Sequence, residues 1–316
     1  MKRGLLGGLC LVLILRVACG AVPLIVSLDF FANPNHVPLY VAEALGFYSE
    51  EGIDVEIIIP ANPSDPVKLA AARAIDVALT PQINYLIARS EGLPLLAIGA
   101  LIDHSLGGLL GLAERGFGEM DDLRGKRIGY ALAPLEPILW RSMLVCAGIG
   151  EGEVELINVG FSTMQALLAG SVDAIGAFRN FEAIQAALQG FEPVFIPQEA
   201  YCIPLTYEII LAVHPDTMDE RRCELEGFLR ALGRAIAFTK ERPEEALRLF
   251  FEANPDLDDD LSRLSYRATL PLFAAGARHD RFEVWEEIQA YLVDQELIEQ
   301  ALPIEELYTS ALLPDE

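Results

Sequence analysis

The strongest constraint on the fold is an alternation of short β-rich runs with helical segments, which begins near residue 22 and starts a second time near residue 120. The first series opens with the strand-like run "PLIVSLD" (residues 23–29), and a helical pattern follows at residues 36–47. A charged turn, "MDDLRGKRIGY" (residues 120–130), leads into the second series. Strands separated by helices predict a mostly parallel sheet, and the restart predicts a second lobe.

We therefore expect an α/β protein of two lobes joined by a hinge that the chain crosses twice. Lobe 1 comprises residues 21–115 and 208–316, and lobe 2 comprises residues 116–207. No long Gly/Ser linker separates the lobes, so we expect strand-like crossings near residues 112–121 and 201–208. Beyond residue 215 the apolar residues recur at helical spacing, which predicts a helical C-terminal segment.

The first 20 residues predict an export signal. Two basic residues precede an apolar run at residues 5–15, which is too short to span a bilayer, and small residues follow it. Cleavage after Gly20 fits the small residues at this point, whereas Cys19 is the alternative position, at which a lipid would be attached. Arg16 stands where lipoprotein signals normally carry an aliphatic residue, which favours plain cleavage. The mature chain is then exported, either free in the periplasm or anchored to the membrane surface by a lipid.

The net charge of −24 limits the partners of this chain. Nucleic acids and anionic lipids are bound by basic surfaces, so we expect no nucleic-acid partner. A hydrophobic content of 52% indicates a folded chain, for which we expect a monomer.

Three of the five cysteines lie outside the leader. Cys146 falls on the apolar face of a predicted helix and is expected in the core. A bridge between Cys202 and Cys223 is compatible with an oxidising compartment, but nothing in the sequence selects it. Neither a CxxC pair nor a cysteine–histidine pairing is present, so no zinc site is predicted.

Motifs of catalysis are missing from the sequence. It contains no GxSxG, P-loop, HExxH or GxGxxG pattern, and its four histidines lie far apart. We therefore expect a protein that is not an enzyme and that uses no cofactor and no metal.

Aromatic and amide side chains follow four of the predicted strands, in the segments "DFFANPNH", "TPQIN", "NVGFS" and "GAFRNFEA". In an open parallel sheet the ligand crevice lies beyond the carboxyl ends of the strands. Aromatic rings stack on a flat heterocycle, while amides and a carboxylate bind the donors and acceptors on its edge. The candidate ligand-binding residues are Phe30, Asn33, His36, Gln82, Asn84, Asn158, Phe178, Glu182 and Tyr207.

Each candidate also fits an ordinary structural role. Asn33 fits a helix N-cap, and His36 is as well suited to a structural hydrogen bond as to a ligand contact. Glu182 in a first helical turn complements the helix dipole, and Tyr207 fits a core position almost as well as a cap over the ligand. Only their occurrence together at several strand ends favours a binding cleft.

Several of these segments occur in the same order in one family. The segments "LDFFANPNHVPLYVAEALGFYSEEGIDVEI", "NPSDPVKLAAARAIDVAL", "GKRIGY", "NVGF", "DAIGAFRNFE" and "LPIEELYTSALLP" resemble the thiamine-precursor binding proteins of bacterial ABC importers. That group is related to the fungal pyrimidine synthase of thiamine biosynthesis. The resemblance implies the type II periplasmic-binding-protein fold, hinge closure on a small heterocyclic ligand such as formylaminopyrimidine, and delivery to an ABC permease in the membrane.

The resemblance to the synthase fails at its reactive residues. Its pyridoxal-phosphate lysine and its reacting histidine align with Thr80 and Asn84, which can neither form a Schiff base nor supply an imidazole. The usual first-strand Trp of the importer group is Phe30 here, and the matching carboxylate is Glu182. The resemblance therefore implies a binding protein for an unphosphorylated ligand. A riboflavin precursor or another heterocycle, or a sulfonate- or nitrate-type anion, remains an alternative ligand.

Overall fold

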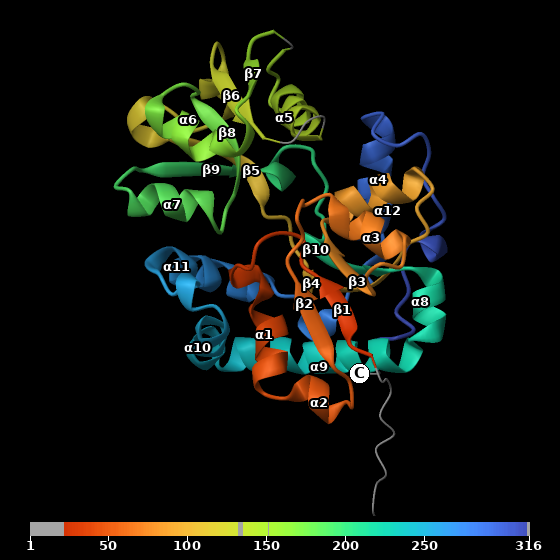
Figure 1. Ribbon diagram of the computed structural model, residues 1–316. Coiled ribbons are helices and arrows are strands. Elements are labelled where there is room, and N and C mark those ends of the chain that lie inside the picture. The colour runs from red at the N-terminus through yellow and green to blue at the C-terminus, as the bar shows by residue number, and fades with distance from the viewer. Residues whose placement is uncertain (1–21, 132–134, 151, 315–316) are drawn as a thin grey trace, which may run out of the picture.

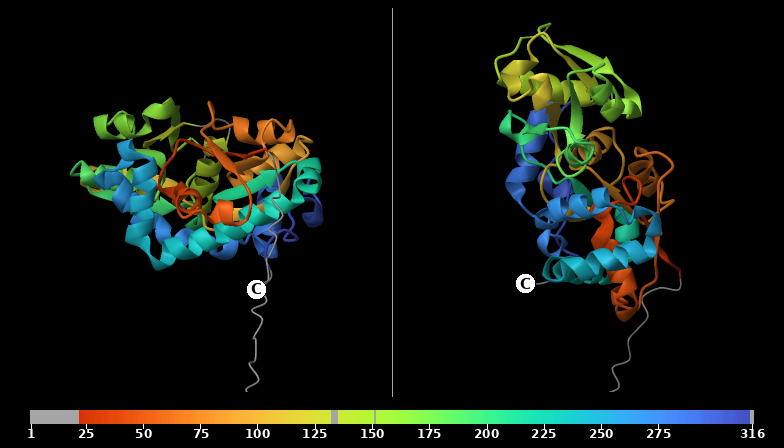
Figure 2. Two further views of the ribbon diagram at one scale, coloured as in Figure 1. Left: turned by 60° about the horizontal axis from the view of Figure 1, so that its bottom comes forward. Right: turned by 90° about the vertical axis from the view of Figure 1, so that its left-hand side faces the viewer.

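The computed structural model describes residues 22–131, 135–150 and 152–314. These residues form two five-stranded sheets with helices packed around them (Figure 1). Two further views show the sheets as parts of two lobes stacked one on the other (Figure 2). This architecture confirms the predicted α/β fold with a helical C-terminal segment. The predicted leader and Cys19 lie outside the described residues.

Sheet A, in lobe 1, has the strand order β2-β1-β3-β10-β4. β1 is parallel to β2 and β3, whereas β10 runs antiparallel between β3 and β4. Its central strands are continuous apolar runs, which suits a sheet covered on both faces. The strands are β1 (Leu24–Ser27), β2 (Val55–Ile58), β3 (Val77–Thr80), β4 (Leu96–Ile102) and β10 (Ile209–Val213).

Sheet B, in lobe 2, has the order β7-β6-β8-β5-β9, with β5 antiparallel to both of its neighbours. Gly176 in β8 lets a helix lie close to this sheet, because a Cβ at this position would come within 2.5 Å of the Trp140 ring. The strands are β5 (Gly107–Leu112), β6 (Arg127–Tyr130), β7 (Glu155–Asn158), β8 (Ala174–Phe178) and β9 (Pro193–Pro197).

Helices cover both sheets, and those after residue 214 pack around lobe 1 (Figure 1). Lobe 1 also contains α1 (Val37–Ala44), α2 (Phe47–Glu50), α3 (Asp65–Ala71) and α4 (Gln82–Ser90). Lobe 2 contains α5 (Leu135–Cys146), α6 (Thr163–Ala169) and α7 (Glu182–Leu188). The C-terminal helices are α8 (Pro215–Glu220), α9 (Arg222–Glu241), α10 (Pro243–Ala253), α11 (Asp260–Thr269) and α12 (Phe282–Asp294).

The long helix α9 confirms the helical spacing read from the sequence. It lies along the base of lobe 1, where it packs against α1 (Figure 1). Its apolar stripe is buried, and each large side chain in it removes enough apolar surface from water to contribute about 1.5–3 kcal/mol. The stripe consists of Leu225, Phe228, Leu229, Leu232 and Ile236.

The first hinge crossing lies upstream of the position predicted from the sequence. β4 belongs to sheet A and β5 pairs with β8 and β9 of sheet B, so the chain crosses at residues 103–106. The expected crossing near residues 112–121, and with it a lobe boundary at residues 115–116, is therefore wrong. The charged turn there connects two strands of the same sheet, and an apolar run such as β5 does not indicate which sheet it will join. The second crossing, residues 198–208 between β9 and β10, includes the predicted segment.

The disulfide also differs from expectation. Cys146 is exposed at the last position of α5 and is bonded to Cys202 in the second crossing, so neither a core Cys146 nor a Cys202–Cys223 bridge is present. The helix ends at Cys146, beyond the surface that packs on the sheet. The two cysteines are 56 positions apart in the sequence, so closing this loop removes enough unfolded-state entropy to stabilise the fold by about 4 kcal/mol.

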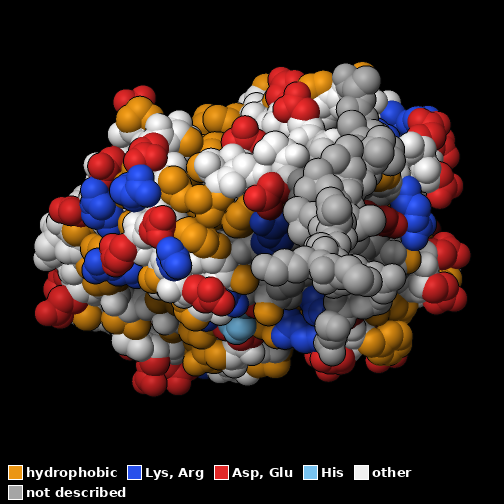
Figure 3. Space-filling view, turned by 90° about the horizontal axis from the view of Figure 1, so that it is seen from below, with side chains coloured by type: hydrophobic (Ala, Val, Ile, Leu, Met, Phe, Trp, Pro, Cys, Tyr) orange, Lys and Arg blue, Asp and Glu red, His pale blue; other side chains and the backbone are white. Residues whose placement is uncertain are grey.

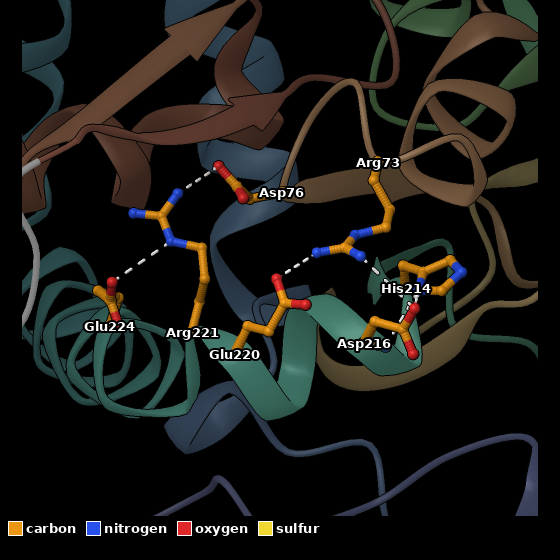
Figure 4. Close-up of polar contacts among 7 residues, drawn as sticks. All are labelled: Arg73, Asp76, His214, Asp216, Glu220, Arg221 and Glu224. Carbon is orange, nitrogen blue, oxygen red and sulfur yellow. Dashed lines mark hydrogen bonds and ion pairs between the residues drawn. The ribbon is translucent and has the colours of Figure 1, made fainter.

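A cluster of ion pairs closes the base of lobe 1, at the amino ends of β1 and β3. Arg221 binds Asp76 at 2.7 Å and Glu224 at 3.4 Å, and Arg73 binds Asp216 and Glu220 (Figure 4). We call these six residues the base cluster. The described side chains of the surrounding face are a mixture of acidic, basic and apolar groups (Figure 3). Among the described residues, no helix has the length and apolar character needed to span a membrane.

Candidate ligand-binding site

The carboxyl ends of strands from both sheets meet around the two crossings. In sheet A, β3 ends at Thr80, which pairs with Ile210 at the start of β10. In sheet B, β8 ends at Phe178, which pairs with Gly107 at the start of β5. Both crossings therefore connect the edges at which a parallel sheet binds ligands. We call the segments at these edges, residues 29–36, 103–106, 178–182 and 198–208, the junction.

The segment after β1 presents two exposed aromatic rings. Phe30 is 40% exposed, and its ring lies 5.0 Å from that of Phe31 in an edge-to-face arrangement. Asn33 fixes this segment from within, since its side chain accepts from the Asn35 N–H and donates to the Phe31 carbonyl, each at 2.9 Å. Asn33 thus has the capping role that was the structural alternative in the sequence, and Phe30 remains open to contact.

His36 is completely buried and uses both ring nitrogens for structural contacts. Its Nδ1 accepts from the Asn33 N–H at 3.2 Å, which leaves the proton on Nε2 to be donated to Asp29 Oδ1 at 2.8 Å. His36 therefore positions the carboxylate of Asp29 at the end of β1. Asp29 itself was not singled out from the sequence, although it directly precedes the aromatic pair.

Gln82 and Tyr207 bind each other beside the second crossing. The Gln82 side chain is buried, and its Oε1 accepts from the Tyr207 N–H at 3.0 Å. Tyr207 is only 1% exposed, its ring packs 5.9 Å from that of Trp285, and its hydroxyl oxygen accepts from the Arg281 N–H at 3.0 Å. Tyr207 thus occupies a core position and not an open surface from which it could cap a ligand.

Two further candidate amides are Asn84 in α4 and Asn158 in β7. Asn84 is half-buried in the first turn of α4, and its side chain makes no hydrogen bond within the described part of the chain. Asn158 is exposed at the end of the edge strand β7, where its Oδ1 accepts from the Gly160 N–H at 3.0 Å. β6 and β8 separate it from the crossing strand β5, so the structure does not bring Asn158 to the junction.

The end of β8 supplies a second aromatic face and a carboxyl group. Phe178 is 43% exposed, and its N–H donates to Glu182 Oε2 at 2.8 Å. Burial raises the pKa of Glu182, the N–H of Phe178 partly offsets this, and the nearby charge of Glu136 adds to the rise. This carboxyl group therefore sits in a poorly solvated position next to an exposed ring.

One contact joins the two lobes directly at the junction. The buried amide of Asn180 donates to Asn35 Oδ1 at 2.8 Å and to Thr269 Oγ1 at 2.7 Å. Asn35 belongs to the Phe30 segment and Asn180 to the Phe178 segment, so the two exposed rings come from segments in contact. Asn180 does not cap the following helix, because the N-cap of α7 is Phe181.

Side-chain hydrogen bonds, rather than a strand ladder, hold the two crossings together. Ser105 Oγ lies 2.9 Å from Thr206 Oγ1, and Glu208 accepts from the Leu106 N–H at 2.7 Å. Burial raises the pKa of Glu208 to about 7; the Leu106 bond and Arg179 lower it, while Asp29 and Glu199 raise it further. Sequence reasoning missed Glu208, because residue 208 appeared there only as the end of the predicted second crossing.

Four buried polar atoms at or beside the junction have no hydrogen-bond partner in the described part of the chain. Two are donors, Gln82 Nε2 and Arg179 Nε, and two are acceptors, Asn180 Oδ1 and Glu199 Oε2. A buried polar atom without a partner is unfavourable by about 1–3 kcal/mol. Such atoms mark the positions where the polar atoms of a ligand gain most by binding. No group of acidic, cysteine or histidine side chains within the described residues is arranged to hold a metal.

This architecture is that of the periplasmic binding proteins. The periplasmic aliphatic sulphonate binding protein of Escherichia coli superimposes with a TM-score of 0.73 over 93% of this chain and 94% of its own, at 14% identity. An identity this low establishes the shared fold and nothing about the ligand.

The chain belongs to the NMT1/THI5-like family, whose model matches residues 33–246. A Haemophilus influenzae protein provisionally assigned to thiamine biosynthesis is 35% identical, over 89% of this chain and 90% of its own. The formylaminopyrimidine-binding protein of Halalkalibacterium halodurans is 32% identical, over 90% and 89%. A 4-amino-5-hydroxymethyl-2-methylpyrimidine phosphate synthase of Legionella pneumophila is 31% identical, over 91% of both chains. The resemblance recognised in the sequence is thereby confirmed. The relatives in this family are named as binding proteins and as synthases. Whether this chain is a binding protein or a synthase must therefore be judged from its own residues.

Proposed function

We propose that this protein is the exported solute-binding protein of an ABC importer, and that it binds a pyrimidine precursor of thiamine of the formylaminopyrimidine type between its lobes. The observation that carries the proposal is the pair of exposed rings, Phe30 and Phe178, on segments of different lobes that contact each other through Asn35 and Asn180. The family, the binding-protein fold and the formylaminopyrimidine-binding relative support the same function.

In this proposal the two rings flank the pyrimidine, because aromatic faces stack on flat heterocycles. Glu182 accepts from the amino group of the ligand, and Gln82 and Asn84 bind its ring edge. The other candidates act through the elements that they fix: Asn33 and His36 hold the Phe30 segment, and Tyr207 holds the second crossing. Asn158 has no direct role unless the ligand reaches the edge of sheet B.

Delivery follows from hinge closure. The crossings are tied to each other through Ser105 and Thr206, so the lobes can rotate about them as rigid bodies. The closed form with its ligand is the one that the permease recognises. The protein acts as a monomer in the periplasm, or at the membrane surface if Cys19 carries a lipid.

Synthase activity is the weaker alternative, because the residues at the reactive positions do not fit it. Thr80 is buried at the end of β3, with its hydroxyl 3.4 Å from the Pro81 carbonyl, and a hydroxyl cannot form a Schiff base with pyridoxal phosphate. Mixing the protein with this cofactor should therefore produce no new absorbance band. A stable band would favour the synthase.

Calorimetric titration of the mature protein tests the binding function. We expect heat with formylaminopyrimidine or a related aminopyrimidine, and none with a riboflavin precursor, nitrate or an alkanesulfonate. Binding of only one of the latter ligands would overturn the proposal.

Replacing a stacking ring provides a second test. Phe30→Ala should weaken pyrimidine binding by about tenfold to a hundredfold, because it removes one stacking face worth roughly 1–3 kcal/mol. Phe47→Ala is the matched control, since Phe47 is half-buried in α2 at the opposite end of lobe 1, under Arg234. Equal affinities of the two variants would remove Phe30 from the site.

A further inference from the structure

Arg179 is held at the junction by a carboxylate. It follows Phe178 at the end of β8, and its Nη2 lies 2.5 Å from Oε1 of Glu199, which comes from the segment after β9. The guanidinium also lies 5.6 Å from the centre of the Phe195 ring, and the backbone N–H of Arg179 donates to Leu106 in the first crossing. The guanidinium is therefore fixed between the end of sheet B and the hinge.

Acidic groups outnumber basic ones around this pair. The charged side chains that act on Glu208 are Asp29 from lobe 1 and Glu199 from lobe 2, which are acidic, and Arg179, which is basic. Glu182 adds a further carboxyl group three residues after Arg179. Two further basic groups, Arg281 before α12 and Lys240 in α9, act on another carboxylate, Asp103 of the first crossing. An anion entering the junction would thus meet carboxylates on both lobes.

A free guanidinium at this position would favour anionic ligands. Arginine binds sulfonates and phosphates through two parallel N–H bonds, which makes it a preferred residue for such anions. Here Glu199 occupies part of that hydrogen-bonding edge and cancels the charge. We infer that Glu199 is a specificity-determining residue that excludes anionic ligands from the site by neutralising Arg179. The inference concerns the same interlobe site as the proposed function and rests on it to that extent.

The atoms left unpartnered indicate what the site accepts instead. Arg179 Nε is a buried donor and Glu199 Oε2 a buried acceptor, and neither has a partner in the described residues. The two groups belong to one ion pair, so a ligand with a donor beside an acceptor can satisfy both. Carboxamides, formamides and aminopyrimidine edges have this pattern. A sulfonate or phosphate has acceptors only, and its charge would be repelled by Glu199.

The test compares two ligands that share a ring and differ in charge: a hydroxymethyl aminopyrimidine and its phosphate ester. Ethanesulfonate serves as a small anionic probe. The wild-type protein should bind the alcohol and neither anion. Glu199→Gln frees Arg179 and should raise the affinity for the phosphate ester and ethanesulfonate by about tenfold or more, since hydrogen bonds to a charged group contribute roughly 1.5–3 kcal/mol. This gain should shrink with added salt, because screening weakens charge pairing.

Two further variants make the result specific. The double variant Arg179→Gln/Glu199→Gln carries no charge at the pair and should show no gain for anions. Glu153→Gln is the matched control, because Glu153 forms a comparable pair with Arg124 at 2.6 Å on the surface of lobe 2. Melting temperatures of all variants establish that each is folded. If Glu199→Gln alone does not fold, the wild-type comparison of the alcohol with its phosphate ester still tests the inference.

The outcomes separate this inference from the proposed function. A folded Glu199→Gln with unchanged anion affinity, or a wild-type protein that binds the phosphate ester as tightly as the alcohol, would overturn the inference. If no pyrimidine binds to any form but ethanesulfonate binds to Glu199→Gln, the inference stands and the pyrimidine ligand is wrong. If the double variant gains anion affinity equally, Arg179 is not the anion-binding group and the inference fails.

Discussion

Two clusters of charged side chains, one at the base of lobe 1 and one at the junction between the lobes, differ in how completely they are paired. In the base cluster, Arg221 binds Asp76 and Glu224 and also donates to the carbonyls of Val22 and Pro23 (Figure 4). At the junction, Arg179 has a single acidic partner among the residues that the structure describes, and within them the donors and acceptors around it remain unused.

The difference separates a structural cluster from a binding one. Buried polar groups in stable proteins are almost always hydrogen-bonded. An arginine that donates from all three guanidinium nitrogens, as Arg221 does, therefore contributes to the fold. A ligand-binding site without its ligand has hydrogen-bond donors and acceptors that are not used. The positions of the two clusters support this distinction. The base cluster lies at the amino ends of the strands, whereas the junction lies at their carboxyl ends, where parallel sheets bind ligands.

Removing the arginine of the base cluster should have the largest effect on stability. Arg221→Ala leaves Asp76 partly buried without its counter-charge, which should lower the free energy of unfolding by about 3 kcal/mol. Pyrimidine affinity should stay unchanged. Urea unfolding and calorimetry on the same sample measure both quantities.

The neighbouring residue gives the control for this prediction. Arg222 pairs with Glu226 at 3.0 Å on an exposed face of α9, so Arg222→Ala should lower stability by only about 0.3–0.5 kcal/mol. A large loss of ligand affinity in Arg221→Ala would show that the base cluster is not purely structural.

At the junction, by contrast, one carboxyl group should destabilise the fold at neutral and alkaline pH. The pKa of Glu208 rises from 4.5 to about 7 in the folded state, so the folded protein binds the proton more tightly than the unfolded chain. Stability is then lost as the pH rises from 4.5 to 7. Glu208→Gln keeps the acceptor for Leu106 without the charge, and it should be more stable than wild type at pH 8 by up to about 3 kcal/mol, with the advantage vanishing near pH 4.5.

Urea unfolding of both proteins across this pH range measures the effect. Glu153→Gln is again the control, because Arg124 and the Gly150 N–H lower the pKa of Glu153, and replacing it should bring no gain at pH 8. A Glu208→Gln variant with the same pH dependence as wild type would mean that this carboxyl group is as well solvated as one on the surface.

These two clusters also show what the sequence alone can predict. Strand and helix patterns depend on neighbouring residues, so the α/β alternation and the stripe of α9 were predicted correctly. The capping role of Asn33 is equally local and was foreseen as an alternative. Charge pairs such as Arg179–Glu199 and Arg221–Asp76 join residues 20 and 145 positions apart, and no local pattern predicts them.

The same limit explains the errors. β5 is an apolar run that would fit either sheet, and its membership is decided by pairing with β8 and β9. Cys146 forms a disulfide bond with Cys202 because the second crossing passes the end of α5. Tyr207 became a core residue because Trp285, far along the chain, covers its ring. In each case a long-range contact outweighed the local signal.

The smallest predicted effect concerns the contact that links the lobes. Asn180→Ala removes both hydrogen bonds from its amide, but Asn35 and Thr269 keep their own bond at 3.2 Å, so the loss of stability should stay near 1 kcal/mol. The contact joins the lobes as they stand here. Its loss should therefore disfavour the closed form and weaken ligand binding by about fivefold, which corresponds to the same free energy. Calorimetry gives the affinity, and small-angle scattering with and without ligand gives the degree of closure.

Asn254→Ala is the matched control, because the Asn254 amide donates at 3.0 Å to a carbonyl of its own helix and links no lobes. If both variants lose affinity equally, or if Asn180→Ala closes on ligand as fully as wild type, the contact does not favour closure. A loss of ligand affinity in Asn180→Ala alone would show that polar groups of the junction set the equilibrium between the open and closed forms. The base cluster would then remain a region whose polar groups only hold the fold.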